Sequence, residues 1–390
     1  MMQILLVKNK YRRVTSTCTL SDVEVFSMVM GYKTVPCTCI NEESFMFRSL
    51  NKIASNLSHV FYRGTVVGLF SLGIVSTASA QSVCVFDPAG KAGDYYRLLD
   101  QYALEASSWG VSLEVKVYTD EETAVKDYEA KQCDAVVATG VRLARFNNFP
   151  TTIEAIGALP TYPLLKSMTK TLTTSGGAAK MLTKSGNATV GIIPMGAVYV
   201  FVRDRSIDTV EELAGKKIAT MDYDKPSVVM VEKIGAIMVP ADLGSIGPKF
   251  NNGDVDACYI SAPAYQPFEL WKGLGETGGV VRLPIAQATL QVMAREEAFP
   301  ADFSAKSREF FWSKFDEAMG YVSKAEAGIP SKYWIEIPAA DIPDFDEMFQ
   351  RSRIELRDNH SAYHPKMLGV MRDKRCAADA TRPECAEDKE

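Results

Sequence analysis

The sequence predicts an α/β protein of two lobes, whose parallel-rich sheets are joined by crossing strands and enclose a ligand cleft. Strands and short helices alternate over residues 200–263, so each strand must return in the same direction through a crossover. The same alternation over residues 82–140 indicates a second sheet of this kind. Open parallel sheets bind ligands outside the carboxyl ends of their strands, so binding residues are expected to follow strands in both lobes.

The first 80 residues are expected to be a leader rather than part of the folded protein. Residues 46–80 contain a basic flank, an apolar core at 65–75 and an Ala-x-Ala site at 78–80, which indicates a signal peptide cleaved before Gln81. The apolar core is too short to span a bilayer as a helix. Residues 1–45 lack periodicity and precede the signal, so we interpret them as a disordered, non-native upstream extension.

The charge of the chain excludes several classes of partner. The formal net charge is −5, and residues 1–80 are net basic, so the mature part is more acidic than the whole chain. An acidic protein is a poor partner for nucleic acid or for anionic lipid. No stretch after residue 80 has the length of a transmembrane helix, so we expect a soluble mature protein without stable membrane insertion.

Five cysteines follow the leader, and secretion makes disulfide pairing the default for those that lie close together. Cys376 and Cys385 flank a short loop that a disulfide could close. Cys84 lies in the first predicted strand and Cys133 begins the third, so adjacent parallel strands could bring them together. Cys258 is left over, and in a buried strand it is expected to be a small apolar filler.

Residues 81–197 and 286–358 are assigned to lobe I. The chain opens β-α-β-α-β, with strands in "SVCVF", "VSLEVKVYT" and "CDAVVATG". "TIEAIGALP" is predicted to be another strand, and "YPLLKSMTKTL" and "GGAAKMLTKSG" are predicted helices. A further strand, "ATVGIIPMG", then leads to the crossing segment "AVYVFVRD".

Residues 198–285 are assigned to lobe II. It begins with the crossing strand 198–202, a short capped helix at 209–213 and a strand at 217–222. A helix, a strand, another helix and a fourth strand entered through "NGDVDA" follow, and "ATLQVMARE" returns the chain to lobe I. Later residues are predicted to be helical. Residues 359–390 are assigned to a C-terminal tail, whose last part, residues 377–390, is expected to be polar and mobile apart from any disulfide.

Ten residues at strand ends and in the crossing segment are candidates for ligand contact, because charged, hydroxyl and aromatic side chains at such positions build small-molecule sites. They are Asp87, Lys91, Thr139, Arg142, Arg145, Tyr199, Asp222, Tyr223, Tyr259 and Tyr265. Alternatives remain open: solvated arginines, an ordinary capped turn around Asp87, and a core position for any single tyrosine. Asp222 facing Arg142 across the cleft could equally form a latch between the lobes.

Two motifs of lobe II carry a resemblance to a known family. "DTVEELAGKKI", followed about forty residues later by "NNGDVDA", is similar to periplasmic solute-binding proteins and, more narrowly, to the substrate receptors of TRAP transporters. Within these receptors, the chain looks closest to an outlying group described as accessory components of RND-type efflux pumps. The resemblance covers Gln81 to about Leu356 and implies the type II periplasmic binding fold. It also implies a monomeric receptor in the periplasm of a Gram-negative bacterium, which closes on a solute and presents it to a membrane complex.

One departure from the resembled family concerns the ligand. TRAP receptors usually carry an arginine after the "G-x-K-I" motif, where it clamps a ligand carboxylate in bidentate fashion. Here that position is Ala219, and Asp222 follows it. Either another arginine does this work or the ligand is not a simple organic acid.

Other chemistries find little support in the sequence. "GLGETG" matches a dinucleotide-binding pattern, but it follows a helix and precedes a strand, the reverse of the order that this turn requires. His360 and His364 lack the further ligands of a metal site, and no nucleophile–base pair is evident, so we expect neither cofactor nor catalysis. The leading prediction is a periplasmic receptor that closes on a small organic, potentially anionic ligand and delivers it to TRAP-like or RND-type membrane subunits. The alternative is an interaction component of an RND-type efflux system with a vestigial cleft.

Overall fold

The computed structural model describes residues 80–387 and 389–390. The predicted extension at 1–45 and all of the predicted signal peptide except Ala80 lie outside these described residues. Within the described part of the chain, no helix is long and apolar enough to cross a membrane.

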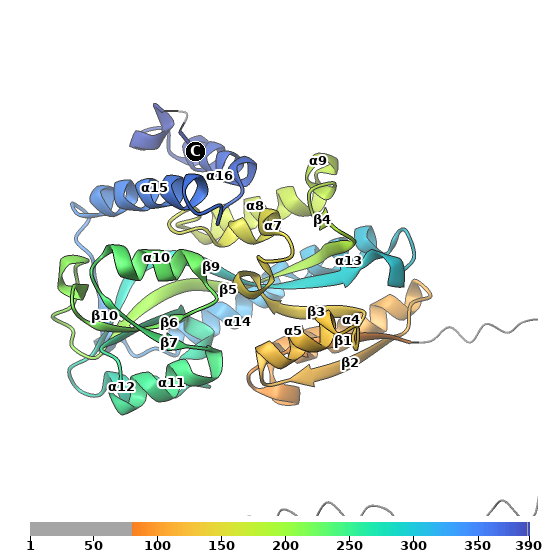
Figure 1. Cartoon of the computed structure of the whole chain (residues 1–390), viewed down its shortest axis with the longest axis horizontal. Helices are drawn as coiled ribbons and strands as arrows, with labels where there is room; N and C mark the ends of the chain where they lie inside the picture. The colour runs from red at the N-terminus through yellow and green to blue at the C-terminus, as the bar shows by residue number, and fades with distance from the viewer. Residues whose placement is uncertain (1–79, 388) are drawn as a thin grey trace, which may run out of the picture. The chain divides into compact units, whose positions relative to one another are not determined.

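The described residues build one mixed sheet in the order β2-β1-β3-β9-β5-β8-β6-β7, with β10 beside β9 and β4 beside β5. The strands are β1 (Gln81–Phe86), β2 (Leu113–Tyr118), β3 (Ala135–Thr139), β4 (Thr183–Lys184), β5 (Asn187–Val202), β6 (Lys217–Met221), β7 (Ile237–Ala241), β8 (Ala257–Ser261), β9 (Gly279–Arg295) and β10 (Trp334–Ile335). Strands β1–β3 and β6–β8 form parallel groups on either side of the antiparallel pair β5 and β9 (Figure 1). The predicted α/β class with crossing strands is confirmed, but the two predicted sheets are one, because β5 and β9 pair with both parallel groups.

The crossing strands β5 and β9 are each longer than the sequence indicated. The predicted strand "ATVGIIPMG" and most of the crossing segment "AVYVFVRD" form one continuous strand, β5, and the predicted returning strand "ATLQVMARE" is the second half of a longer strand, β9. Their register shifts three times, between Thr189 and Gly191, Pro194 and Gly196, and Val198 and Val200. Such irregularities bend a strand, so they let one sheet serve two lobes. The exact lobe boundaries at residues 198 and 286 stay predictions.

Helices cover the sheet and connect its parallel strands (Figure 1). The α-helices are α4 (Asp94–Ser108), α5 (Glu121–Glu129), α6 (Gly140–Leu143), α7 (Asn148–Thr151), α8 (Tyr162–Thr174), α9 (Gly176–Ala179), α10 (Lys225–Lys233), α11 (Leu243–Asn252), α12 (Trp271–Leu274), α13 (Phe303–Ser313), α14 (Phe315–Ala327), α15 (Ile342–Asp358) and α16 (Pro365–Ala378). The 3-10 helices are η3 (Gly90–Ala92), η4 (Thr152–Glu154), η5 (Glu211–Leu213), η6 (Ala262–Ala264), η7 (Glu296–Ala298), η8 (Ser331–Tyr333) and η9 (Pro383–Cys385).

Local chemistry accounts for the helix boundaries in both lobes. In lobe I the Asp120 side chain accepts a hydrogen bond from the Thr123 N–H at 2.7 Å and caps α5. In lobe II Asp242 and Ser245 cap α11 reciprocally, and Gly253 ends it in the left-handed conformation at φ 81°. The glycine of "NGDVDA" therefore acts as a helix terminator that delivers the chain into β8.

The two predicted disulfides are confirmed. Cys84 of β1 pairs with Cys133, which directly precedes β3, and Cys376 of α16 pairs with Cys385. Cys258 is a buried free cysteine in β8, as expected for an apolar filler.

Three local predictions are wrong. Residues 152–160, predicted as a strand, form η4 and an irregular turn, and the Glu154 side chain accepts a hydrogen bond from the Thr289 N–H where the pairing of β3 with β9 ends. A buried backbone donor needs an acceptor, and here a side chain supplies it in place of a strand. The predicted helix "GGAAKMLTKSG" is only α9 and then turns into β4, and the predicted helix 209–213 is the 3-10 helix η5.

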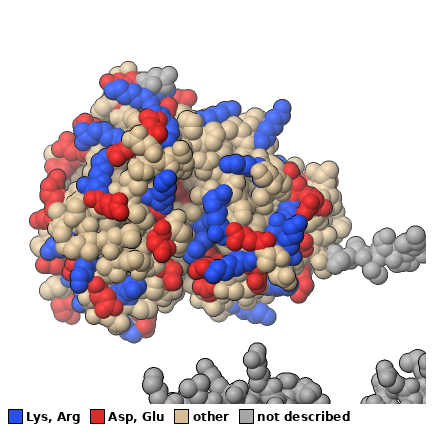
Figure 2. Space-filling model, viewed as in Figure 1, with Lys and Arg blue, Asp and Glu red and all other residues tan. Residues whose placement is uncertain are grey.

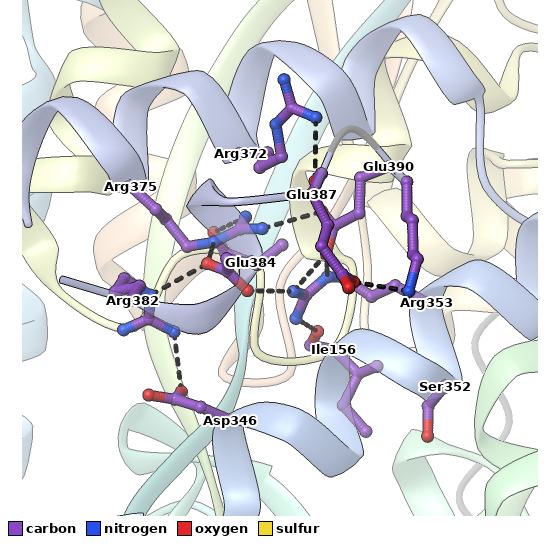
Figure 3. Close-up of polar contacts among 12 residues, drawn as sticks. Ile156, Asp346, Ser352, Arg353, Arg372, Arg375, Arg382, Glu384, Glu387 and Glu390 are labelled. Atoms are coloured by element: carbon purple, nitrogen blue, oxygen red, sulfur yellow. Dashed lines mark hydrogen bonds and ion pairs between the residues drawn. The ribbon is translucent and has the colours of Figure 1, made fainter. Parts of the chain in front are cut away.

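The carboxyl-terminal residues were expected to be mobile, and this prediction is also wrong. They contain α16 and a buried ion cluster, here called the C-terminal clasp, formed by Arg353, Arg375, Glu384 and Glu390 (Figure 3). Arg375 contacts Glu384 at 2.6 Å and Glu390 at 2.7 Å, and all four side chains are at most 3 % exposed. Arg353 also donates to the carbonyl of Ile156 at 2.9 Å, so the clasp fastens the end of the chain to the turn after η4.

Candidate ligand-binding site

A cavity of about 1290 Å³ lies at the strand ends of both lobes. Its wall includes the loops after β1, β3, β6 and β8, the middle of β9, and side chains of α10 and α15. This volume slightly exceeds the usual range of roughly 300–1,000 Å³ for small-molecule pockets, so the cavity has room for a solute of substantial size. The position agrees with the rule that open α/β sheets bind ligands at the carboxyl ends of their strands.

Four side chains join the two lobes at the cavity wall, and we call them the interlobe latch: Glu121, Thr139, Arg142 and Tyr223. The Glu121 carboxylate accepts hydrogen bonds from the N–H and hydroxyl of Thr139 at 2.7 and 2.6 Å, which hold it at the end of β3. Its other oxygen accepts from Arg142 Nε and from the Tyr223 hydroxyl, each at 3.3 Å.

An aromatic contact completes the interlobe latch. The Arg142 guanidinium lies over the Tyr223 ring, with 3.4 Å between Cζ and the ring centroid. Because Arg142 follows β3 of lobe I and Tyr223 follows β6 of lobe II, this cation–π contact spans the cleft. Burial and the nearby Glu121 charge raise the pKa of Tyr223, so its hydroxyl stays protonated and donates.

Asp87 lines the cavity, but its carboxylate organises the turn after β1. One oxygen accepts from the Ala89 N–H at 2.9 Å and the other from the Tyr96 N–H at 3.0 Å. Burial raises the pKa of Asp87, while these two hydrogen bonds oppose the rise. Residue 93 is glycine because a Cβ there would lie about 2 Å from the Asp87 carboxylate.

Two acidic residues that the sequence did not single out also line the cavity. Burial, followed by the charges of Asp224 and Glu121, raises the pKa of Glu154 to about 8, although hydrogen bonds from Thr289 oppose the rise. Burial raises the pKa of Asp224, at the start of α10, to about 6. Glu154 lies against Gly140, where a Cβ would come within 2.3 Å of its carboxylate. Only the Asp-Lys-Pro pattern of a helix start could have drawn attention to Asp224, and nothing comparable marks Glu154.

The structure brings six of the ten predicted residues to the cavity wall. These are Asp87, Thr139, Arg142, Arg145, Tyr223 and Tyr259. Arg145 lies nearer the solvent and pairs with Glu129 at 3.1 Å. Tyr259 lines the cavity, and its hydroxyl is buried.

The other four predicted residues lie away from the cavity wall. Lys91 and Asp222 are exposed, and Tyr265 packs edge-on against Trp271 in the lobe II core. The Tyr199 hydroxyl donates to Glu326 at 3.0 Å beside the irregular part of β5, so it supports the crossing strands. The latch considered for Asp222 is made by the next residue, Tyr223.

The described part of the chain contains no candidate metal site. No group of three or more His, Cys, Asp or Glu side chains there is placed to hold a metal ion. Basic and acidic side chains alternate over the face seen in Figure 2, without a single-sign patch. The candidate site is therefore the cavity, with its latch and its two buried acids.

Two lobes, paired crossing strands and a cavity at the strand ends define the class of solute-binding receptors. The model of the family described as "Solute-binding protein AdeT 1/2" matches residues 103–390, and the chain belongs to this family. It is 37 % identical over 302 residues to the probable solute-binding protein AdeT1 of Acinetobacter baumannii, covering 77 % of this chain and 99 % of the relative. The probable solute-binding protein AdeT2 of the same organism is 24 % identical over 233 residues, covering 59 % of this chain and 96 % of the relative.

The solved structures similar to this fold include TRAP periplasmic solute-binding proteins, which confirms the resemblance inferred from the lobe II motifs. One from Rhodoferax ferrireducens with bound malonate has a TM-score of 0.61 at 14 % identity, covering 76 % of this chain and 98 % of that protein. DctP7 of Bordetella pertussis, a receptor binding pyroglutamic acid, has a TM-score of 0.58 at 12 % identity, with coverage of 76 % and 99 %. At these identities the likeness establishes the fold, and the ligand must be argued from this chain's own residues.

Proposed function

We propose that the chain is a periplasmic receptor that closes over a small organic solute and hands it to an integral-membrane transporter. The observation that carries this proposal is the cavity at the strand ends, walled by both lobes and bridged by the interlobe latch. A ligand that touches both walls binds the closed arrangement better than the open one, so it shifts the population toward closure. A transporter can then distinguish loaded from empty receptors by their shape.

Several features support the periplasmic setting of this function. Two disulfides favour an oxidising compartment, and the leader at 46–80 has the pattern of a secretory signal. We further propose that the partner is a TRAP-like membrane complex, in line with the fold relatives, or an RND-type complex, which the sequence resemblance implies. A vestigial cleft is not favoured, because the cavity retains buried polar groups that have no structural partner.

Ligand occupancy tests the proposed function. The full chain, expressed in a Gram-negative host and purified from its periplasm, is weighed by native mass spectrometry and then denatured to release any solute. We expect a co-purified molecule of small-metabolite size, and we expect less of it with Tyr223→Leu, which removes the contact across the cleft. An empty protein that shows no thermal shift with a broad metabolite panel would overturn the receptor function and direct attention to protein partners.

A further inference from the structure

We propose that the cavity takes an amine-bearing organic cation, with its ammonium group held by Glu154, Asp224 and the side-chain carbonyl of Gln287. This inference rests on the proposed receptor function and specifies its ligand class. It departs from the carboxylate-type ligands named for the solved relatives, among them malonate and pyroglutamic acid.

The two acids of the cavity wall have no cation to balance them. Glu154 Oε1 accepts from the N–H and hydroxyl of Thr289 at 2.8 and 2.5 Å, but no hydrogen bond reaches Oε2 in the described part of the chain. Asp224 accepts a hydrogen bond from the Ser227 hydroxyl. Neither acid forms an ion pair with any described residue, so the wall offers carboxylate oxygens to whatever enters the cavity.

An unpartnered acceptor on β9 provides an independent indication of a donor ligand. Gln287 is 1 % exposed and lines the cavity. Its Nε2 donates to the carbonyl of Leu159 at 3.0 Å, which fixes the orientation of the amide because a carbonyl can only accept. Its Oε1 then has no donor in the described structure. A buried acceptor without a partner is costly, and a ligand N–H would satisfy it.

Glu154 and Asp224 lie close enough to influence each other electrostatically. The Asp224 charge helps to raise the pKa of Glu154, and the charges of both acids raise the pKa of Tyr363, which also lines the cavity. Repulsion from Asp224 and burial keep Glu154 protonated up to about pH 8 in the empty site, and a bound cation would favour its ionised form. An anionic group entering the same space would add to the repulsion.

The arginines of the cavity wall are engaged by neighbouring side chains, so they are not free to act as a carboxylate clamp. Arg142 is paired with Glu121 and stacked on Tyr223. The other basic residues of the wall are neutralised or exposed: Arg97 pairs with Asp94, Arg145 pairs with Glu129, Lys225 donates to the His360 carbonyl, and Lys184 and Lys324 are exposed.

The remaining wall suits an organic body attached to the ammonium group. Aromatic and apolar side chains from both lobes and from α15 face the same space, including Tyr259, Phe268, Phe345, Phe349 and Met230. Aromatic faces attract cations and cover hydrocarbon surface at the same time. The ligand expected from this wall is therefore an amine that carries an aromatic or other apolar body.

Matched probes separate charge from shape. The purified full chain is titrated calorimetrically with two sets of three compounds. The indole set is tryptamine, indole propionate and tryptophol, and the phenyl set is phenethylamine, hydrocinnamate and phenethyl alcohol. Within each set the ring is the same and the terminal group is an amine, a carboxylate or an alcohol. We expect each amine to bind about tenfold tighter than its carboxylate and alcohol analogues. Glu154→Gln, which keeps an acceptor for Thr289, should remove that preference. Glu347→Gln, at an exposed position of α15, is the control and should leave it unchanged.

The outcomes distinguish this inference from the proposed function. A carboxylate that binds tighter than its amine, or a co-purified solute without an amine, overturns the inference while the receptor function stands. An amine preference that survives Glu154→Gln also overturns it, because the acids would then not be the recognition element. Failure of all probes together with an empty purified protein overturns both.

Discussion

Arg142 illustrates how one side chain can be removed from ligand binding by its neighbours. Its charge is balanced by Glu121, and its flat face is covered by Tyr223 from the other lobe. The sequence identified Arg142 as a candidate because it follows a strand, and the residue does line the cavity. Spacing along the chain could not predict that Glu121, 21 residues earlier, would lie beside it. The buried pair needs both partners, since either charge alone would be costly.

The raised pKa of Glu154 predicts how the stability of the folded protein depends on pH. Its pKa is about 8 in the folded protein, against 4.5 for an ordinary glutamate, because burial and the Asp224 and Glu121 charges disfavour the carboxylate. Between these two values the unfolded chain ionises while the folded site stays protonated, so folding stability contributed by this group falls as pH rises. Compared with the wild type, Glu154→Gln should therefore gain free energy of unfolding between pH 5 and pH 9. We expect a gain on the order of 1–2 kcal/mol, because the side chain is partly open to the cavity and solvent weakens the effect.

Urea unfolding at both pH values measures this effect. The pKa of Asp224 is raised to about 6, so this residue also makes the free energy of unfolding fall as pH rises, but at lower pH. Asp224 is present in both proteins, so its contribution cancels when the two are compared. The same pH dependence for the wild type and Glu154→Gln would mean that Glu154 ionises normally.

At the scale of elements, strand β5 contains the register shifts of the crossing region. Gly196 has φ 87°, and a Cβ there would lie 2.3 Å from Val322 Cγ1 of α14. Gly196→Ala should cost about 2–4 kcal/mol, from a left-handed backbone and a collision together. Gly186→Ala is the matched control, because its φ is 77° but nothing lies within 4 Å. Thermal unfolding should show a larger loss for Gly196→Ala, partly restored by Val322→Ala; equal losses would exclude the collision.

The C-terminal clasp supports a second prediction at the scale of elements. Glu384 accepts from both buried arginines, with contacts of 2.6 Å to Arg375 and 3.1 Å to Arg353. Glu384→Gln leaves two guanidinium groups sharing one carboxylate in a buried place, which should cost about 3–5 kcal/mol. Thermal melting compares it with Glu347→Gln, an exposed control on α15. A clasp variant as stable as the control would show that the ion cluster contributes nothing to holding α15 and α16.

The elements that the sequence predicted correctly depend on local signals, and those that it missed depend on contacts between distant residues. Strand and helix periodicity, capping residues and glycine stops predicted most elements of both lobes, because these signals act over a few neighbouring residues. The irregular turn at 152–160 has the apolar composition of a strand, but scattered contacts hold it beside β9: Thr289 donates to Glu154, Gly157 donates to the Ile285 carbonyl and Gln287 donates to the Leu159 carbonyl. The charged end of the chain has the composition of a solvated tail, and only the folded chain shows that Arg353 of α15 and Arg375 of α16 are its buried partners.

At the scale of the whole molecule, the sequence predicted where the candidate site lies but not several of the side chains that form its wall. Strand ends of two α/β lobes locate a cavity by topology alone, so residues after β1, β3, β6 and β8 were found. Glu154, Gln287 and Phe349 reach the cavity from a turn, a crossing strand and a late helix. No local pattern connects those three segments, which meet only in the folded chain.

The cysteine arrangement allows a fluorescent dye to be attached at one chosen position of the folded protein. Cys258 is the one cysteine outside a disulfide among the described residues, it is fully buried, and burial raises the pKa of its thiol far above neutrality. A single Lys324→Cys substitution at the exposed rim of the cavity would thus add the one reactive thiol of the folded domain. A solvatochromic dye coupled there would turn lobe closure into a fluorescence signal, without any unfolding or reduction of the native disulfides.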